Sequence, residues 1–396
     1  MKEIFNRNED PLMSIIVLCY KNQKLLRGML DSIFMQDYSR IELIVSDDGT
    51  TNFDTDEIVS YIEKNKRENI ESYRVFTNTI NIGTVKHIKR VLPYIEGEYY
   101  IMTAADDRFA EEDIISSYIR LFKKNPNSVW LCSKCMMTSP DYQRRIYITP
   151  TVEDEPFFAE GDSKLLFSRW ARRGIIIPCA MCFKKGAIDL VGGIDENYKY
   201  LEDWPLVLKL LRSGYAPLFL DKVTSLHSVG GITNSNERYG TRVRKEFYED
   251  KYLLFETEVE PYLELLTVHD RKMYKLYRKE IMDRNYFLDI LFGGKTKGKK
   301  MEFLLKNPKY LGWVFERVWT RYQDRIQRKK MCATSHFLLL SSVIFFKCKV
   351  VFVGLFNFLA FFDIVLAGVM LIFTLISWPL TKYCKYKAKI RKMLVN

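Results

Sequence analysis

Short apolar runs alternate with amphipathic segments along the first 110 residues. Residues 14–19 and 41–45 are almost continuously apolar, which is typical of strands buried on both faces of a parallel sheet. Between them, residues 25–34 place their apolar side chains at helical spacing. The alternation continues with expected helices at 58–66 and 87–94 and expected strands at 73–77 and 99–103. The pattern predicts βαβ units and a Rossmann-like half of an α/β fold.

The pattern changes twice further along the chain. Expected strands at 128–132 and 175–183 and an expected helix around 204–211 extend the α/β pattern towards residue 240. A charged, aromatic-rich stretch with helical spacing follows. We therefore expect a catalytic domain at 1–240, a helical and basic amphipathic linker region at 241–330, and membrane-associated hydrophobic segments with a basic tail at 331–396.

Two long apolar runs near the end of the chain suggest contact with a membrane. They cover residues 333–346 and 350–380, are separated by Lys347-Cys348-Lys349, and the second is interrupted once, by Asp363. A spanning helix needs about 20 apolar residues, so the second run is long enough and the first is marginal. The alternative is a pair of buried helices in a soluble domain. Because a single span would place the lysine-rich tail outside, the sequence favours a hairpin or a re-entrant pair.

Basic residues exceed acidic ones by 61 to 49, which gives a net charge of +12. The excess is concentrated at 295–300, 317–330 and 382–392. Such clusters suit nucleic acid or an anionic membrane surface, and the adjoining apolar runs favour membrane lipid over nucleic acid. No secretory signal is recognisable at the start of the chain. We therefore expect a cytoplasmic membrane protein whose catalytic domain faces the cytoplasm.

Three acidic pairs follow apolar segments in the expected fold. They are Asp47-Asp48, Asp106-Asp107 and Glu202-Asp203. Ligands of α/β sheets bind beyond the carboxyl ends of the strands, so these carboxylates are candidates for one shared cleft. Each pair also has a plainer interpretation: a turn, a helix N-cap, or an acidic first turn that the helix dipole favours.

The motifs in this order resemble the family 2 glycosyltransferases with the GT-A fold. The segments that carry the resemblance lie between residues 13 and 233 and read SIIVLCY, YSRIELIVSDDGT, NIG, EGEYYIMTAADDR and GGIDENYKYLEDW. The resemblance implies an α/β fold with a mostly parallel sheet flanked by helices. It also implies inverting transfer of a sugar from a nucleotide-diphosphate donor to an acceptor hydroxyl.

The same resemblance implies which residues bind the nucleotide sugar. Asp48, after Asp47, matches the carboxylate that hydrogen-bonds the base, and Gly83 with Lys86 matches the donor-binding loop and its helix. One side of the base slot would be formed by Leu18, Cys19 and Tyr20. A solvated helix residue is the plainer interpretation of Lys86.

Asp107 and Asp106 match the family's metal motif, with Ala104 in place of its first aspartate. Mg²⁺ and Mn²⁺ prefer hard oxygen ligands, so we expect Asp107 to ligate a divalent cation and Asp106 to hold the ribose or share the ion. His227 stands where related enzymes carry a further metal ligand, although a lone histidine is more often structural.

Asp203 matches the family's catalytic base, with Glu202 orienting it or touching the acceptor. A base must remove the acceptor proton as the oxygen attacks the anomeric carbon. The acceptor suggested by the hydrophobic tail is a glycan on a lipid carrier, as in cell-surface polysaccharide synthesis. The alternatives are a non-catalytic nucleotide-binding or scaffolding protein with this fold and a nucleotidyltransferase, which usually has a glycine-rich loop after its first strand.

Two CxxC pairs, Cys132/Cys135 and Cys179/Cys182, raise the possibility of a zinc site. Each pair falls in an expected strand, where residues three apart point to opposite faces. The sequence therefore disfavours zinc.

Overall fold

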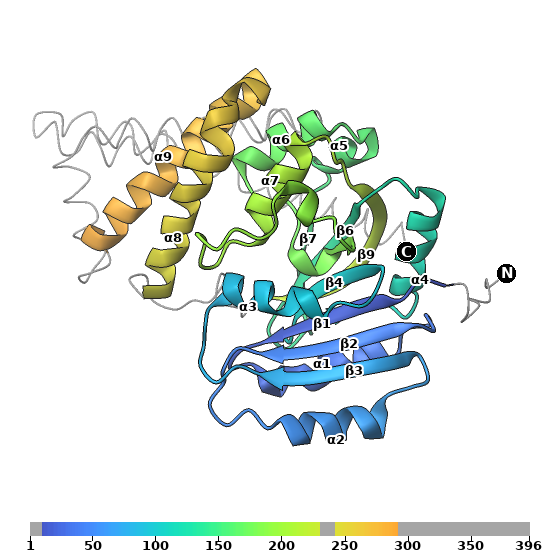
Figure 1. The fold of residues 1–396 in the computed structure, drawn as a ribbon. Coiled ribbons are helices and arrows are strands. Elements are labelled where there is room, and N and C mark those ends of the chain that lie inside the picture. Colours follow the sequence, from blue (N-terminus) through green and yellow to red (C-terminus); the bar gives the residue numbers. More distant parts are fainter. Residues whose placement is uncertain (1–9, 230–241, 292–396) are drawn as a thin grey trace, which may run out of the picture. The chain divides into compact units, whose positions relative to one another are not determined.

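The computed structural model describes residues 10–229 and 242–291, which belong to a compact unit spanning 1–293 (Figure 1). Its strands are β1 (Met13–Cys19), β2 (Ile41–Asp47), β3 (Ile70–Thr77), β4 (Tyr99–Ala104), β5 (Asp107–Phe109), β6 (Trp130–Thr138), β7 (Arg145–Thr149), β8 (Met181–Lys184) and β9 (Leu218–Ser228). Its α-helices are α1 (Gln23–Phe34), α2 (Thr55–Asn65), α3 (Thr84–Val91), α4 (Ile114–Lys124), α5 (Glu155–Glu160), α6 (Ser163–Arg172), α7 (Asp203–Arg212), α8 (Arg242–Leu254) and α9 (Val268–Leu291).

The described strands form one mixed sheet in the order β3-β2-β1-β4-β8-β6-β9-β5, with β7 paired to β6. The first four strands are parallel, as βαβ connections require. β8 then runs antiparallel to both β4 and β6, and β5 runs antiparallel to β9. The expected mostly parallel sheet is therefore wrong for the second half of the domain, where the sheet is mixed.

The sheet separates two hydrophobic cores. Neighbouring residues of β1 point to opposite faces, so Ile15 belongs to one core and Ile16 to the other. Helices α1, α2 and α4 cover the first core, and α3, α6 and α7 cover the second (Figure 1). This three-layer arrangement directs the carboxyl ends of β1, β2 and β4 towards a common edge, because the three strands are parallel neighbours.

The expected strands of the first half are confirmed, while two features of the second half differ. Residues 175–183 are not one strand, because Pro178–Ala180 forms a 3₁₀ turn before β8 begins. The strands β5, β7 and β9 were not anticipated. Proline at the start of the turn explains the break, since its ring and missing N–H favour a turn over a ladder.

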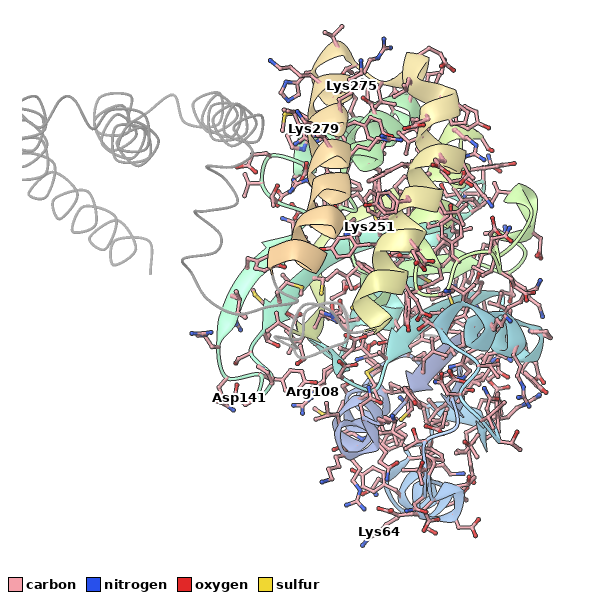
Figure 2. The ribbon with its side chains drawn as sticks, turned by 90° about the vertical axis from the view of Figure 1, so that its left-hand side faces the viewer. Lys64, Arg108, Asp141, Lys251, Lys275 and Lys279 are labelled. Carbon is pink, nitrogen blue, oxygen red and sulfur yellow. The ribbon has the colours of Figure 1, made fainter. Side chains whose placement is uncertain are left out.

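Helices α8 and α9 pack onto the domain, and Figure 2 shows their outward side with Lys251, Lys275 and Lys279 labelled. The buried Asp270 of α9 pairs with two arginines of α6, Arg169 and Arg172. Within residues 10–229 and 242–291, no helix has the length and apolar character needed to span a bilayer. The apolar runs at 333–346 and 350–380 lie outside the described residues, and so do the three basic clusters. The expected domain boundaries stay a prediction.

Candidate active site

The turn after β2 is fixed by the Asp47 carboxylate. This group is fully buried and accepts hydrogen bonds from the backbone N–H of Thr50 at 2.7 Å and from the hydroxyls of Thr50 and Thr77 at 2.6 Å each. Thr50 lies in the turn itself, and Thr77 is the last residue of β3. Asp47 therefore stabilises the turn at this edge of the sheet through internal hydrogen bonds.

Asp48 holds the loop that carries Gly83. Its carboxylate accepts from the side-chain amides of Asn78 and Asn81, both at 2.8 Å, and from the backbone N–H groups of Ile82 and Gly83, both at 3.0 Å. Gly83 has φ +89°, a conformation that side chains rarely adopt, and caps α3. The carboxylate is only 3% exposed, so contact with a base would have to replace one of these internal bonds. Its assignment as the base contact stays a prediction.

Gly49 lets the two loops approach each other closely. A Cβ atom at this position would lie 2.4 Å from the backbone carbon of Ile80, and φ is +73°. The Asp-Gly sequence is therefore needed for the contact between the β2 turn and the Gly83 loop, in addition to its turn propensity.

The other residues predicted to bind the nucleotide lie at the end of β1 and on α3. Leu18 is half-buried at the end of β1, Cys19 is buried, and Tyr20 is half-buried. Burial, followed by the charge of Asp47, raises the pKa of Cys19 to about 12, so its thiol is neutral. Lys86 is exposed on α3. Their predicted contacts with a nucleotide remain predictions.

Asn22 connects this edge to the first metal candidate. Its side-chain oxygen accepts from the Tyr20 N–H at 3.1 Å, and its amide donates to the Asp106 carboxylate at 3.3 Å. Burial, followed by the charge of Asp107, raises the pKa of Asp106. The Tyr142 hydroxyl donates to the Asp106 carbonyl at 2.9 Å. Asp106 thus connects Asn22, just beyond the end of β1, to its neighbour Asp107, the metal candidate.

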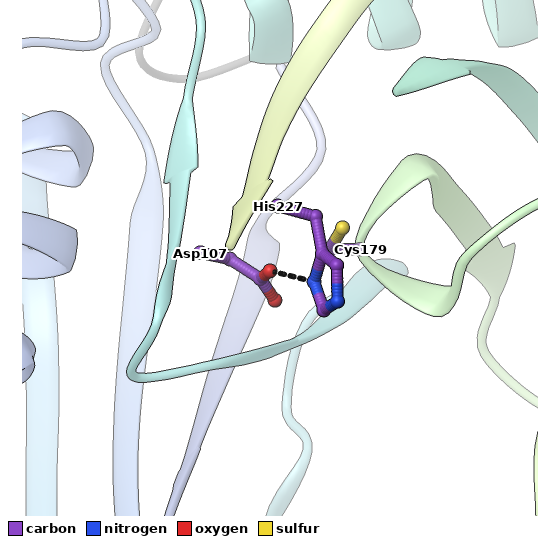
Figure 3. A group of neighbouring side chains, drawn as sticks. All are labelled: Asp107, Cys179 and His227. Carbon is purple, nitrogen blue, oxygen red and sulfur yellow. Dashed lines mark hydrogen bonds and ion pairs between the residues drawn. The ribbon is translucent and has the colours of Figure 1, made fainter. Parts of the chain in front are cut away.

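Asp107, His227 and Cys179 form the candidate metal centre (Figure 3). One ligand atom from each of the three side chains lies within 4.8 Å of the others. β5 and β9 place Asp107 directly opposite His227, and the carboxylate oxygen lies 2.7 Å from His227 Nδ1. The second Asp107 oxygen accepts from Thr103 Oγ1 at 2.9 Å and from the Ala104 N–H at 2.8 Å, which fixes the orientation of the group.

The chemistry of these donors fits a hard divalent ion held by Asp107 and His227. Burial disfavours the charged form of His227, but its bond to Asp107 outweighs this and raises its pKa to about 9, so a bound cation would have to displace the proton of the imidazole. The hydrogen bond with Cys135, together with burial, raises the pKa of Cys179 well above its usual value, so its thiol stays neutral. A thiolate would favour softer ions, whereas a carboxylate with an imidazole suits Mn²⁺ or Mg²⁺.

The cysteines do not pair as the CxxC spacing suggested. Cys179 lies in the 3₁₀ turn, so its expected strand position was wrong. Cys132 and Cys135 both belong to the same core, because register shifts around Lys134 alter the alternation of β6. The sulfur of Cys135 lies 3.9 Å from that of Cys179. No group of three or more cysteines suited to zinc occurs among the described residues.

Glu202 and Asp203 open α7 and are both half-buried. Burial raises the pKa of Asp203 to about 6, although backbone hydrogen bonds oppose the shift. Burial and the charge of Asp203 raise the pKa of Glu202 well above its usual value. Burial therefore disfavours the charged form of both carboxyl groups. A carboxylate with a pKa near 6 suits a general base.

Asp250 on α8 holds the segment that precedes this pair. Its buried carboxylate accepts from the backbone N–H groups of Lys199 at 3.0 Å, Tyr200 at 2.6 Å and Leu201 at 3.0 Å. The Lys199 carbonyl in turn accepts from the Val85 N–H of α3 at 3.4 Å. Asp250 therefore links the candidate base to the helix that follows the Gly83 loop.

Asp250→Asn is expected to lower the kcat of sugar transfer by about ten- to a hundredfold, since small displacements of a catalytic group cost this much. The KM for the donor should change little, because the contacts of the donor loop remain. Glu249→Gln is the matched control, since Glu249 is an exposed neighbour on α8 that meets the Lys199 ammonium at 3.6 Å. Steady-state kinetics of both variants, measured on folded protein, test whether Asp250 positions the candidate base. An unchanged kcat in Asp250→Asn would show that the segment keeps its position without this carboxylate.

Residues 174–179 run from the ring of Trp204, the residue that follows the candidate base Asp203, to Cys179 of the candidate metal centre. A Cβ on Gly174 would lie 3.9 Å from the Trp204 ring, and Cys179 is five residues further on. Five residues span at most about 18 Å of extended chain. The segment thus limits the distance between the two groups, and their convergence on one cleft stays a prediction.

Asn22, Cys179 and Asp250 were not identified from the sequence as parts of this region. Asn22 stands just beyond the first strand, which is the signal that would have identified it. Cys179 was noted only as half of a CxxC pair, Asp250 carries no motif, and only the folded chain brings them to the site.

A family model described as glycosyl transferase family 2 matches residues 14–183. A processive diacylglycerol beta-glycosyltransferase of Mycoplasma genitalium is 27% identical over 116 residues, which are 29% of this chain and 33% of that protein. An uncharacterized glycosyltransferase, EpsJ, of Bacillus subtilis is 22% identical over 216 residues, 54% of this chain and 59% of that protein. The chain thus matches about a third to three fifths of these relatives' lengths.

Among solved structures, the Pyrobaculum calidifontis mannosyltransferase PcManGT in complex with GDP-Man and Mn²⁺ gives a TM-score of 0.48 at 15% identity, covering 78% of this chain and 85% of that one. S. aureus TarS 1–349 in complex with UDP-GlcNAc gives 0.47 at 17% identity, covering 77% and 82%. TM-scores below 0.5 assign neither fold nor function by themselves. The family match makes residues 14–183 of this chain similar to glycosyl transferase family 2.

Proposed function

We propose that this chain is an inverting glycosyltransferase that moves a hexose from a nucleotide-diphosphate donor to an acceptor hydroxyl. The observation that carries the proposal is the half-buried Glu202–Asp203 pair, in which burial raises the pKa of Asp203 to about 6. The family match over residues 14–183 supports a nucleotide-sugar donor.

Asp203 is the general base in this proposal. Its carboxylate takes the proton of the acceptor hydroxyl while the hydroxyl oxygen forms a bond to the anomeric carbon. The bond from that carbon to the diphosphate oxygen breaks on the opposite face, and the nucleoside diphosphate leaves with the electron pair. Attack from the face opposite the leaving group inverts the anomeric configuration. Burial and the charge of Asp203 raise the pKa of the neighbouring Glu202, so a second negative charge beside the base is disfavoured.

Asp107 and His227 are the residues that would hold Mn²⁺ or Mg²⁺, because their ligand atoms lie together and are fixed by Thr103 and the Ala104 N–H. Such an ion, when bound, neutralises charge on the departing diphosphate. Asp106, which accepts a hydrogen bond from Asn22, is the candidate for a contact with the ribose of the donor. Lys86 is the candidate for a phosphate contact from α3.

We propose a lipid-linked glycan as the acceptor, at the cytoplasmic face of the membrane, in cell-surface polysaccharide synthesis. The apolar runs at 333–346 and 350–380 and the basic clusters support this acceptor. The name of the Mycoplasma genitalium relative, a diacylglycerol glycosyltransferase, is consistent with a lipid acceptor.

A panel of sugar nucleotides tests the proposal. The full chain, with Mn²⁺ present, is expected to hydrolyse one of them slowly or to be stabilised against thermal unfolding by it. Hydrolysis should stop when the ion is chelated. If no sugar nucleotide produces hydrolysis or stabilisation, the non-catalytic scaffolding protein becomes the better interpretation.

A further inference from the structure

Tyr142 anchors the loop between β6 and β7 beside the candidate metal centre. It is the only half-buried residue of the segment 140–147, whose other residues are exposed. Its hydroxyl donates to the backbone carbonyl of Asp106 at 2.9 Å. Burial raises the pKa of Tyr142 to about 12, so the hydroxyl keeps the proton that it donates. The loop therefore reaches the turn between β4 and β5 through this phenol group.

The backbone of Tyr142 has an unusual conformation. Its φ is +60°, a region that bulky side chains rarely occupy, because their Cβ atom comes too close to the backbone. The turn that holds this conformation is closed by the Tyr142 N–H, which donates to the Ser139 carbonyl at 2.8 Å. Such conformations cost free energy and persist only where the surrounding structure maintains them. The side-chain contacts of Tyr142 therefore have to compensate for a strained backbone.

Arg108 packs against the ring of Tyr142. Its guanidinium carbon lies 3.8 Å from the ring centre, which is a cation–π contact. The same guanidinium lies against α1, where a Cβ atom added to Gly28 would come within 2.7 Å of one of its nitrogens. Arg108 and Asp141, the residue before Tyr142, are labelled in Figure 2. The Tyr142 ring is therefore connected to α1 through Arg108, and this contact needs a glycine on the helix.

Asp106 and Asp107 are held by separate contacts, although they are neighbours in the chain. The Asp106 carboxylate accepts from the Asn22 amide at 3.3 Å, and its backbone carbonyl accepts from Tyr142. The Asp107 carboxylate is instead fixed by hydrogen bonds with the end of β4 and with β9. Loss of the Tyr142 hydroxyl should therefore release Asp106 and leave the Asp107 carboxylate in place.

We propose that Tyr142 is a positioning residue for donor binding: its hydroxyl holds Asp106 ready for the nucleotide sugar, and Arg108 keeps its ring in place. The inference rests on the proposed glycosyltransferase function, in which Asp106 is the candidate for the ribose contact. Without the hydroxyl, the turn between β4 and β5 becomes ordered only when the donor binds, and this ordering lowers the donor affinity. Once the donor is bound, the turn is in place and the rate of the chemical step is unchanged.

Tyr142→Phe tests the hydroxyl, and Tyr147→Phe is the matched control, because Tyr147 belongs to the same hairpin and is 51% exposed. The full-length variants are assayed for the KM and kcat of hydrolysis of the sugar nucleotide that wild type hydrolyses. Their affinity for Mn²⁺ is measured without donor by paramagnetic resonance. We expect Tyr142→Phe to raise the donor KM by about three- to tenfold, the size of one lost hydrogen bond. Its kcat and its Mn²⁺ affinity, and all three values of Tyr147→Phe, should equal those of wild type.

Gly28→Ala tests the support of the ring by Arg108 from a second position. Alanine favours a helix, so α1 is not weakened, but its Cβ atom displaces the guanidinium. The donor KM should rise while kcat stays the same. In Tyr142→Ala there is no ring for Arg108 to support, so the addition of Gly28→Ala to that variant should raise the donor KM no further.

A donor KM of Tyr142→Phe equal to that of wild type would overturn the proposal and leave the proposed function intact. A lower kcat at an unchanged donor KM would also overturn it, because a variant that only folds less well loses active enzyme and not donor affinity. If the effects of Gly28→Ala and Tyr142→Ala multiplied, Arg108 would not act through the Tyr142 ring. Absence of donor hydrolysis by wild type would instead remove the proposed function itself, and this inference with it.

Discussion

Asp203→Asn is expected to lower the kcat of sugar transfer by on the order of 10²–10⁴-fold, the contribution of a positioned general base. Asparagine keeps the size of the side chain but cannot accept the acceptor proton. Donor affinity should be nearly unchanged, because the Asp48 loop and the Asp107–His227 pair do not involve Asp203. Transfer kinetics and donor binding, measured on the same preparation, separate the two effects.

The pH dependence of kcat is a second test of Asp203 as the general base. The pKa of Asp203 is raised to about 6, so the carboxyl is protonated below that value and the base form is lost as the pH falls. The kcat of wild type should therefore decrease about tenfold for each unit below pH 6 and reach a plateau above it. The residual activity of Asp203→Asn should lack this acidic limb.

Asp195→Asn is the control for the loss of an acidic residue near the same motif. Its carboxylate accepts from the Asn197 N–H at 3.0 Å and shapes the turn before α7. It should retain most of the activity and the same pH profile. Wild-type turnover by Asp203→Asn, or an unchanged acidic limb in that variant, would remove Asp203 from the mechanism. Glu202→Gln with a larger loss than Asp203→Asn would transfer the role to Glu202.

The parallel part of the fold was predictable because its cause is local. The runs at 14–19 and 41–45 are buried on both faces, so composition and spacing identified β1 and β2 without knowledge of their neighbours. The Asp47-Asp48-Gly49 turn followed from the same rule, since it stands at the end of such a strand. What the sequence did not reveal is that Asp48 faces inward and holds the Gly83 loop.

The second half depends on long-range pairing that no local pattern encodes. β5 has three residues and β7 has five, so neither gives a recognisable period. The pairing of Asp107 with His227 closes a sequence separation of 120 residues. His227 was identified as a ligand candidate from its family position, and only the register of β5 against β9 brings it to Asp107. The role of Asp250 arises in the same way, because its partners are backbone N–H groups, which carry no sequence signal.

Asp107→Asn is expected to weaken Mn²⁺ binding by on the order of 10²-fold, at least as much as the loss of a group that merely supports a metal ligand. The amide keeps the size of the carboxylate and can still accept from the Ala104 N–H and the Thr103 hydroxyl, so the fold of β5 should persist. The negative charge that attracts the cation is lost. Paramagnetic resonance of free Mn²⁺ measures the affinity without any need for donor or turnover.

Asp106→Asn is the matched control, one residue away on the same turn. The Asp106 carboxylate meets the Asn22 amide at 3.3 Å and does not belong to the group of three neighbouring ligand atoms. This variant should bind Mn²⁺ almost as wild type does and should lose affinity for the donor instead, while His227→Ala should weaken Mn²⁺ binding by about tenfold or more. If Asp107→Asn bound Mn²⁺ like wild type while Asp106→Asn did not, the ion would belong to Asp106, and the Asp107–His227 pair would be a structural contact between β5 and β9.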